Sequence, residues 1–150
     1  MAVFNGRILA LDLGARRIGL ALSDELGLTA QGLPTLVRKN KRQDLQALKQ
    51  IVEERQVRLV VVGNPLHMSG QQGRQSQNAA LFAESLSSHT GVETKLWDER
   101  LTSREAERVL RQSGISIAKR GAAVDRLAAV LILQSYLDYL AGQQQQEASL

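Results

Sequence analysis

The amino-acid sequence predicts an α/β fold, a five-stranded mixed sheet with helices on both of its faces. Five short apolar runs have the length of strands, and helical apolar patterns follow the third, fourth and fifth runs. The first two runs are so close together that they should form an antiparallel hairpin, whereas intervening helices allow later strands to run parallel. The expected element order is βββαβαβα, with a further helix near the C-terminus.

The first three strands are expected to be consecutive in the chain. Arg7–Leu13 is almost continuously apolar, as in a strand covered on both faces, and Asp12 stands at its C-terminal end. The stretch Gly14-Ala15-Arg16 suits a tight turn into a second strand, Arg17–Ser23. A third strand is expected within residues 28–37.

A helix and a buried strand are expected next. Asn40 can cap the helix, with Gln43 three residues later, and one face of this helix is apolar. The β-branched run over residues 57–62 then predicts a buried strand, which the stretch Gly63-Asn64-Pro65 ends. Because a helix precedes this strand, we expect it to lie parallel to an earlier one.

The second half of the chain predicts a loop, a helix, the fifth strand and two more helices. Residues 66–77 are polar and contain glycines, so they are expected to form a mobile loop before a helix that Gly91 ends. Residues 92–97 have the character of a strand, and a capping box from Thr102 to Glu105 begins the next helix. The remaining expectations are a loop over 113–121, an apolar helix over 122–140 and a disordered tail over 141–150, which leaves a single domain over 1–140.

Composition and charge exclude several classes of protein. The 150 residues include no cysteine, which excludes disulfides, thiolate metal sites and cysteine nucleophiles. The longest apolar run, residues 127–133, is far shorter than the roughly 20 residues that span a bilayer, and no signal peptide is evident. With 43% hydrophobic residues and a net charge of +4, we expect a folded cytoplasmic protein that prefers anionic partners.

Three carboxylates stand in surroundings that are unusual for surface charges. Asp12 ends the most apolar strand, Glu99 follows the fifth strand, and Asp125 lies in a helix whose neighbouring turns are apolar. Each also has a simpler interpretation. Asp12 could form a turn, Asp125 could complement the helix dipole, and Glu99 could be a solvated loop acid.

Considered together, the three acids indicate a metal site. Ligands bind where the C-terminal ends of neighbouring parallel strands meet, and Asp12 and Glu99 end two such strands. The start of a helix that crosses the sheet can bring Asp125 beside them. Three adjacent carboxylates repel one another unless a cation lies between them, and oxygen ligands suit Mg²⁺ or Mn²⁺. Such sites commonly hydrolyse phosphodiester bonds with two metal ions.

Basic residues stand beside each acid in the sequence, and a further basic cluster precedes the first helix. Any one of these groups could be an ordinary solvated face, but their repeated placement favours a rim that binds phosphates. The residues concerned are Arg16, Arg17, Arg100, Arg104, Lys119, Arg120 and the cluster over 38–42.

Four stretches of the chain resemble the YqgF family, also called RuvX. They begin at Asp12, Val62, Trp97 and Val124, and together they cover the chain from residue 7 to residue 140. Members of this family are described as Holliday junction resolvases and as nucleases that process pre-16S rRNA. The resemblance implies a ribonuclease H-like fold, with the sheet order 3-2-1-4-5 and the third strand antiparallel.

The resemblance also implies an activity and a site. Asp12, Glu99 and Asp125 would be the catalytic, metal-binding acids of a two-metal nuclease that uses Mg²⁺ or Mn²⁺. Its expected role is to trim the 5′ end of pre-16S rRNA in ribosome biogenesis. The residues expected to contact the substrate are Arg16, Arg17, Asn64, Arg74 and Arg100.

Other functions fit parts of the same pattern. A resolvase of four-way DNA junctions would cut two strands symmetrically as a dimer, whereas we expect a monomer or a weak homodimer. Some related resolvases carry an acid where this chain has Asn64, which weakens the case for assigning their junction-resolving activity to this chain. A non-catalytic nucleic-acid-binding module predicts that Asp12→Asn leaves function intact. An actin-like ATPase would need two such domains, and 150 residues supply one.

Overall fold

The computed structural model describes residues 6–64, 73–98 and 117–149, except for the side chains of residues 117–125 and 144–149. These residues form one sheet of five strands, in the order β3-β2-β1-β4-β5 that the resemblance implies. The elements are β1 Arg7–Leu13, β2 Arg17–Ser23, β3 Ala30–Val37, α1 Lys41–Glu54, β4 Val57–Asn64, α2 Arg74–Thr90, β5 Glu93–Asp98 and α4 Ile117–Ser149.

The direction of the third strand differs from the expectation. β1 pairs antiparallel with β2, and β2 pairs antiparallel with β3. β1 and β4 are parallel, and so are β4 and β5. The antiparallel strand is therefore β2, and the expectation that it would be the third strand is wrong. Two successive short connections reverse the chain twice, which returns β3 to the direction of β1.

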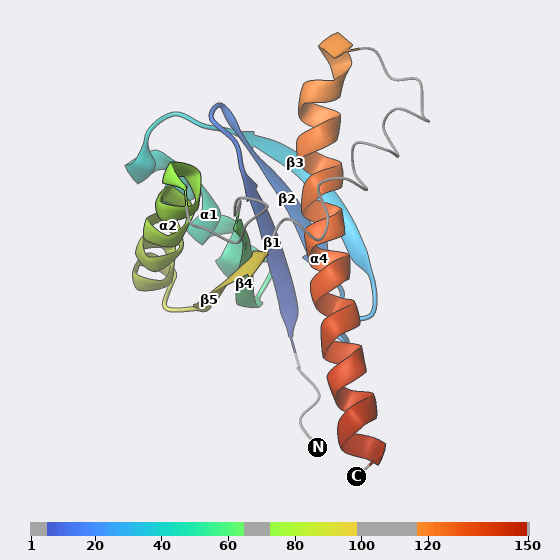
Figure 1. Ribbon diagram of the computed structural model, residues 1–150. Helices are drawn as coiled ribbons and strands as arrows, with labels where there is room; N and C mark the ends of the chain where they lie inside the picture. The colour runs from blue at the N-terminus through green and yellow to red at the C-terminus, as the bar shows by residue number, and fades with distance from the viewer. Residues whose placement is uncertain (1–5, 65–72, 99–116, 150) are drawn as a thin grey trace.

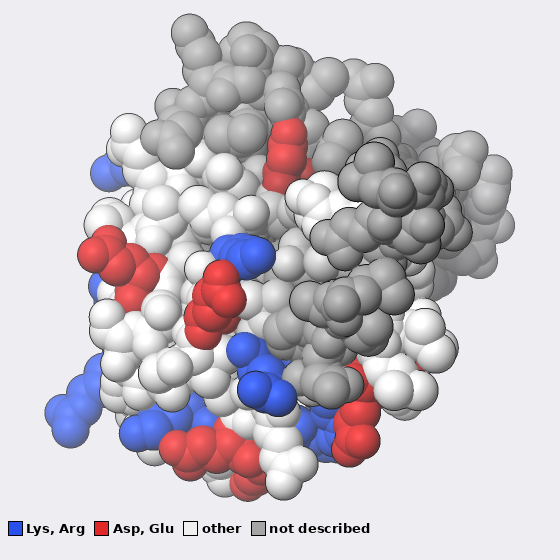
Figure 2. All heavy atoms as spheres, turned by 90° about the horizontal axis from the view of Figure 1, so that it is seen from below, with Lys and Arg blue, Asp and Glu red and all other residues white. Residues whose placement is uncertain are grey.

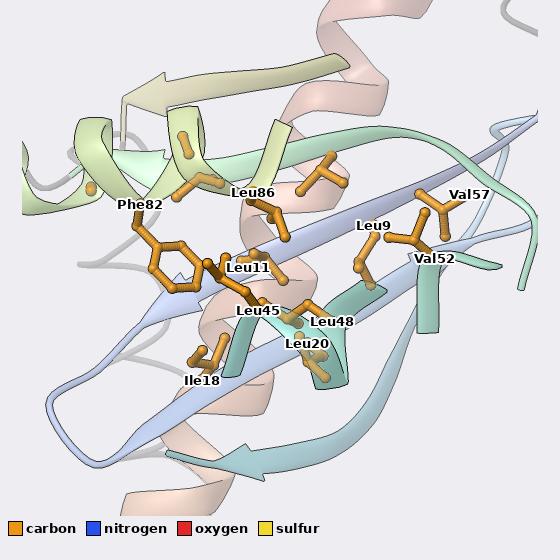
Figure 3. Packing of buried hydrophobic residues seen from close by; sticks show 14 of the residues in the cluster. Leu9, Leu11, Ile18, Leu20, Leu45, Leu48, Val52, Val57, Phe82 and Leu86 are labelled. Atoms are coloured by element: carbon orange, nitrogen blue, oxygen red, sulfur yellow. The ribbon is translucent and has the colours of Figure 1, made fainter. Parts of the chain in front are cut away.

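Helices cover both faces of the sheet (Figure 1). α1 and α2 lie on one face, and α4 lies on the other. Side chains alternate along β1, so that Leu9 and Leu11 pack toward α1 and α2, as Figure 3 shows. Ile8 and Ala10 pack toward α4. The central strand is thus buried on both sides, which explains its almost continuously apolar sequence.

The two ends of the sheet differ in what surrounds them. The turn between β1 and β2 lies at the upper end of the sheet in Figure 1, together with the N-terminal end of α4. We call this the turn end. The C-terminal ends of β1, β4 and β5 point toward it, because the three strands are parallel. The start of β1 and the connection over residues 24–29 lie at the opposite end.

The helices depart from the expected bounds. α2 begins at Arg74, inside the segment expected to be a loop, with Gly73 as its extended N-cap residue. α4 is helical from Ile117, which corrects the loop expected over 113–121, and its backbone stays helical to Ser149 through the segment expected to be a disordered tail. Glutamine, glutamate and alanine, which dominate that segment, have good helix propensity.

Other expectations concern shorter segments. Asn40 caps α1 as expected, because its side chain accepts a hydrogen bond from the Gln43 backbone N–H at 2.9 Å. β5 begins and ends one residue later than expected. The helix predicted from Thr102 lies outside the described residues. No described helix is long and apolar enough to cross a membrane.

Candidate active site

Asp12 lies near the C-terminal end of β1, the central strand of the sheet. Leu11 and Leu13 pack toward α1 and α2, whereas Ala10 packs toward α4. Because side chains alternate, Asp12 lies on the α4 face, where it is half-buried. Asp12 also borders a hollow of about 600 Å³ at the turn end of the sheet. This is the position that the sequence predicts for the central acid.

Arg17, the first residue of β2, lies on the same face of the sheet as Asp12. The strand register places Asp12 opposite Gly19, and Arg17 precedes Gly19 by two residues. Residues two apart share a face, so Arg17 is a diagonal neighbour of Asp12 across the β1–β2 pair. A guanidinium beside the acid suits the binding of a phosphate group.

Gly14 allows the tight turn that follows Asp12. Its N–H donates to the carbonyl oxygen of Arg17 at 2.9 Å. A Cβ atom at Gly14 would lie 2.6 Å from that same oxygen, so a larger residue would force the hairpin apart. The turn carries Arg16, which is exposed and whose carbonyl accepts a hydrogen bond from the Arg38 N–H at 2.8 Å.

Arg38 joins this turn to the helices, a role that the sequence analysis missed. Its Nη1 donates to the carbonyl oxygen of Gly14 at 2.8 Å, and its Nε donates to Oδ2 of Asp44 at 3.2 Å. The guanidinium also lies over the Phe82 ring, 5.5 Å from its centroid. Asp44 is buried and accepts a second hydrogen bond from the Lys39 N–H at 2.9 Å. Arg38 therefore fixes the turn behind Asp12 against α1 and α2.

Asn64 lies on the other face of the sheet from Asp12. It is the last residue of β4, and Val62 two residues earlier packs toward α1 and α2. Its Oδ1 accepts a hydrogen bond from Oγ of Ser76, a fully buried residue in the first turn of α2. Asn64 thus attaches the start of α2 to the sheet. Arg74, the first residue of α2, is exposed nearby in the chain.

The other expected site residues lie wholly or partly outside the description. Glu99 and Arg100 fall outside the described residues, and Asp125 is described only by its helical backbone. Glu99 directly follows Asp98, the last residue of β5, which pairs with Asn64 in the strand register. Among the described side chains, no group of three or more acidic, histidine or cysteine residues could hold a metal ion. The grouping of the three acids therefore stays a prediction.

Trp97 connects β5, which precedes Glu99 in the sequence, with α4, whose backbone includes Asp125. It lies in β5, and its Nε1 donates to Oγ of Ser135 in α4 at 3.1 Å. Its ring also packs edge-on against Tyr136, with 5.2 Å between the ring centroids. These contacts hold the end of β5 against α4, so Trp97 has a clear packing role.

Comparisons with known proteins identify the family. The model of the family described as "RuvX: Holliday junction resolvase" matches residues 6–139. A protein of Koribacter versatilis named "Putative pre-16S rRNA nuclease" is 58% identical over 134 residues, which are 89% of this chain and 88% of that protein. A protein of the same name from Clostridioides difficile is 44% identical over 137 residues, 91% of this chain and 97% of the relative.

Solved structures agree with the fold. RuvC of Thermus thermophilus in complex with a Holliday junction has a TM-score of 0.56 at 13% identity, over 90% of this chain and 96% of that one. The fowlpox virus resolvase with Holliday junction DNA has a TM-score of 0.54 at 15% identity, over 89% and 98% of the two chains. The ribonuclease H-like fold is thereby confirmed, and the match to the family model shows that this chain belongs to the RuvX family.

Proposed function

We propose that this protein is a divalent-metal-dependent nuclease that trims the 5′ end of pre-16S rRNA in the cytoplasm. The observation that carries the proposal is the place of Asp12, a half-buried acid near the C-terminal end of the central strand. Ligands bind at this edge of open α/β sheets. Relatives that match the chain over nearly their whole length carry the pre-16S rRNA nuclease name.

The donor set of the proposed site fits a divalent cation. Asp12 lies near the C-terminal end of β1, Glu99 follows β5 in the sequence, and these two strands have the same direction. Asp125 belongs to the helix that covers the Asp12 face. Carboxylate oxygens are the ligands that Mg²⁺ and Mn²⁺ prefer. In a two-metal site, such ions activate the attacking water and stabilise the leaving oxygen.

The remaining residues of the proposed site would bind and orient the RNA. Arg17 lies on the Asp12 face, where its guanidinium would hold a phosphate near the scissile bond. Arg100 follows Glu99 in the sequence and would do the same from the β5 side. Asn64 and Arg74 would act from the α2 side, Asn64 by keeping the helix start in place.

Metal-dependent cleavage of a 5′-extended 16S precursor RNA tests the proposal. The purified protein should shorten this RNA at its 5′ end in Mg²⁺ or Mn²⁺, and EDTA should abolish the reaction. Glu99→Gln and Asp125→Asn should each lower the cleavage rate at least ~100-fold, on the scale of losing a transition-state charge stabiliser. The matched control is Asp138→Asn, an exposed acid of the same helix that accepts a hydrogen bond from Gln134.

Two outcomes would contradict this function. Cleavage that persists in EDTA would exclude the metal mechanism. A protein that leaves precursor RNA intact but cuts a four-way DNA junction symmetrically would be a resolvase, and sizing of the junction complex should then show a dimer. Near-full cleavage by either acid variant would remove that residue from the site.

A further inference from the structure

A second hollow adjoins the one beside Asp12 at the turn end of the sheet. Its volume is about 550 Å³, and it shares Ala15, Arg38 and Lys41 with the hollow that Asp12 borders. Asp12 borders the first hollow at the turn end, but the α2 residues that line this hollow place it on the face of α1 and α2, opposite to the face of the Asp12 side chain. The two hollows therefore form a continuous depression that runs from the turn end of the sheet across the start of α1. We call the second hollow the basic groove, after its cations Arg16, Lys39 and Lys41.

Within the part of the chain that the structure describes, no acid forms an ion pair with the three exposed cations of the basic groove. Arg16, Lys39 and Lys41 are exposed, and no described residue forms an ion pair or a side-chain hydrogen bond with them. The acid that lines the groove, Asp44, is 3% exposed and is engaged by Arg38 and by the Lys39 N–H. The groove thus presents a net positive surface to solvent.

The placement of these cations is costly for the fold. Lys41 is the first residue of α1, and Arg42 follows it, at the helix end where the macrodipole already carries partial positive charge. Arg16 and Lys39 add like charges to the same groove. A bound polyanion would offset this repulsion, whereas Asp44, the acid in the first turn of α1, is already engaged by Arg38 and by the Lys39 N–H.

The described surface at the opposite end of the molecule lacks this imbalance. Figure 2 views the protein from that side, and acidic and basic side chains are interspersed over the described surface. There Arg7 pairs with Glu25 at 3.8 Å. Among the described residues, the excess of exposed cations without an acidic partner is therefore a feature of the basic groove, which adjoins the hollow that Asp12 borders.

We propose that the basic groove binds the sugar-phosphate backbone of the RNA strand on one side of the scissile bond. This proposal rests on the proposed nuclease function and adds a path for the flanking strand. Arg16, Lys39 and Lys41 contact successive phosphates, and Arg38 forms the wall that separates them from α2. Binding through phosphates is independent of base sequence.

Salt-dependent binding of short fluorescent RNAs, measured in EDTA so that no cleavage occurs, tests the groove. Arg16→Ala, Lys39→Ala and Lys41→Ala should each weaken binding about fivefold near 0.1 M salt, and equally for the precursor flank and a scrambled sequence. Each should reduce the slope of log affinity against log salt by about 0.7, and the triple variant by about 2. Lys49→Ala, in the same helix but outside both hollows, should match the wild type.

Shortening the RNA from each end locates the bound flank. Removal of the flank that occupies the groove should erase the difference between wild type and Lys41→Ala, while removal of the other flank should preserve it. The groove is excluded if its variants bind with the wild-type slope, or if neither truncation changes the effect of Lys41→Ala. Cleavage of precursor RNA by the wild type is measured separately. If the groove variants bind like the wild type while the wild type cleaves the RNA, only the groove proposal is excluded. If the wild type leaves the RNA intact, the nuclease function itself is excluded.

Discussion

The two ends of the sheet use arginine in different ways. At the opposite end, Arg7 pairs with Glu25 across 3.8 Å, and both side chains are substantially exposed, at 35% and 73%. At the turn end, Arg38 pairs with Asp44 at 3.2 Å, and the acid is only 3% exposed. Exposed pairs contribute little to stability, whereas a buried acid depends on its partner. The difference shows that the turn end is built around a fixed ion pair, and the exposed cations around it have no acidic partner among the described residues.

Basic residues that lie close together at the turn end make different contacts. Arg38 has its guanidinium between Gly14, Asp44 and Phe82, where it stabilises the turn that follows Asp12. Arg16 is exposed on the same turn. Two arginines that meet at this turn therefore have different surroundings, because the guanidinium of Arg38 holds the turn in place and the side chain of Arg16 is open to solvent.

The largest expected effect is on the rate of RNA cleavage, and it compares an acid at the turn end with an acid at the opposite end. Asp12→Asn should lower the cleavage rate of precursor RNA at least ~100-fold, because the neutral amide is a poorer ligand for a divalent cation. Asp24→Asn changes an acid at the opposite end and should leave the rate unchanged. Single-turnover cleavage in Mn²⁺ measures both. Equal rates for Asp12→Asn and the wild type would place the chemistry elsewhere.

The second effect is on stability and compares the two ion pairs. Arg38→Ala leaves the buried carboxylate of Asp44 without its cation and should lower the free energy of unfolding by roughly 2–4 kcal/mol. Arg7→Ala removes the exposed pair and should change it by less than about 0.5 kcal/mol. Urea unfolding curves of both variants give these values. If the two variants lose the same stability, burial does not distinguish the pairs.

Local patterns in the sequence account for much of the fold. The strands β1 and β2 follow from continuous apolar runs with a glycine turn between them, and the start of α1 follows from the Asn40 cap. The sequence pattern predicts a later start for α2 than the structure has, because the first residues of this helix are polar and follow Gly73. The contact that anchors it, from Ser76 to Asn64, joins residues 12 positions apart and leaves no periodic signal.

In the candidate site too, local sequence patterns reveal some residues and miss those whose contacts depend on the fold. The place of Asp12 could be predicted, because a charge at the end of an apolar strand is unusual in the sequence itself. The bond from Arg38 to the Gly14 carbonyl spans 24 positions, and only the hairpin and the third strand bring the two residues together. In the sequence, Arg38 is indistinguishable from the lysines beside it, so its positioning role could not be predicted.

The smallest expected effect is a pH dependence at the opposite end of the sheet. The backbone N–H of Thr29 donates to the Asp24 carboxylate at 3.0 Å and, with a second hydrogen bond from Leu28 at 2.7 Å, lowers the pKa of Asp24 below its usual value. A lowered pKa in the folded state contributes stability above the unfolded pKa of roughly 3.9 and loses it as the pH falls through the folded value. The wild type should therefore be more stable than Asp24→Asn at pH 7, and the gap should close as the pH falls below the unfolded pKa and through the lowered pKa of the folded state. Urea midpoints of both proteins across this range measure the gap, and because acid effects on other groups are common to both, a gap that stays constant would show that the charge of Asp24 contributes nothing to this turn.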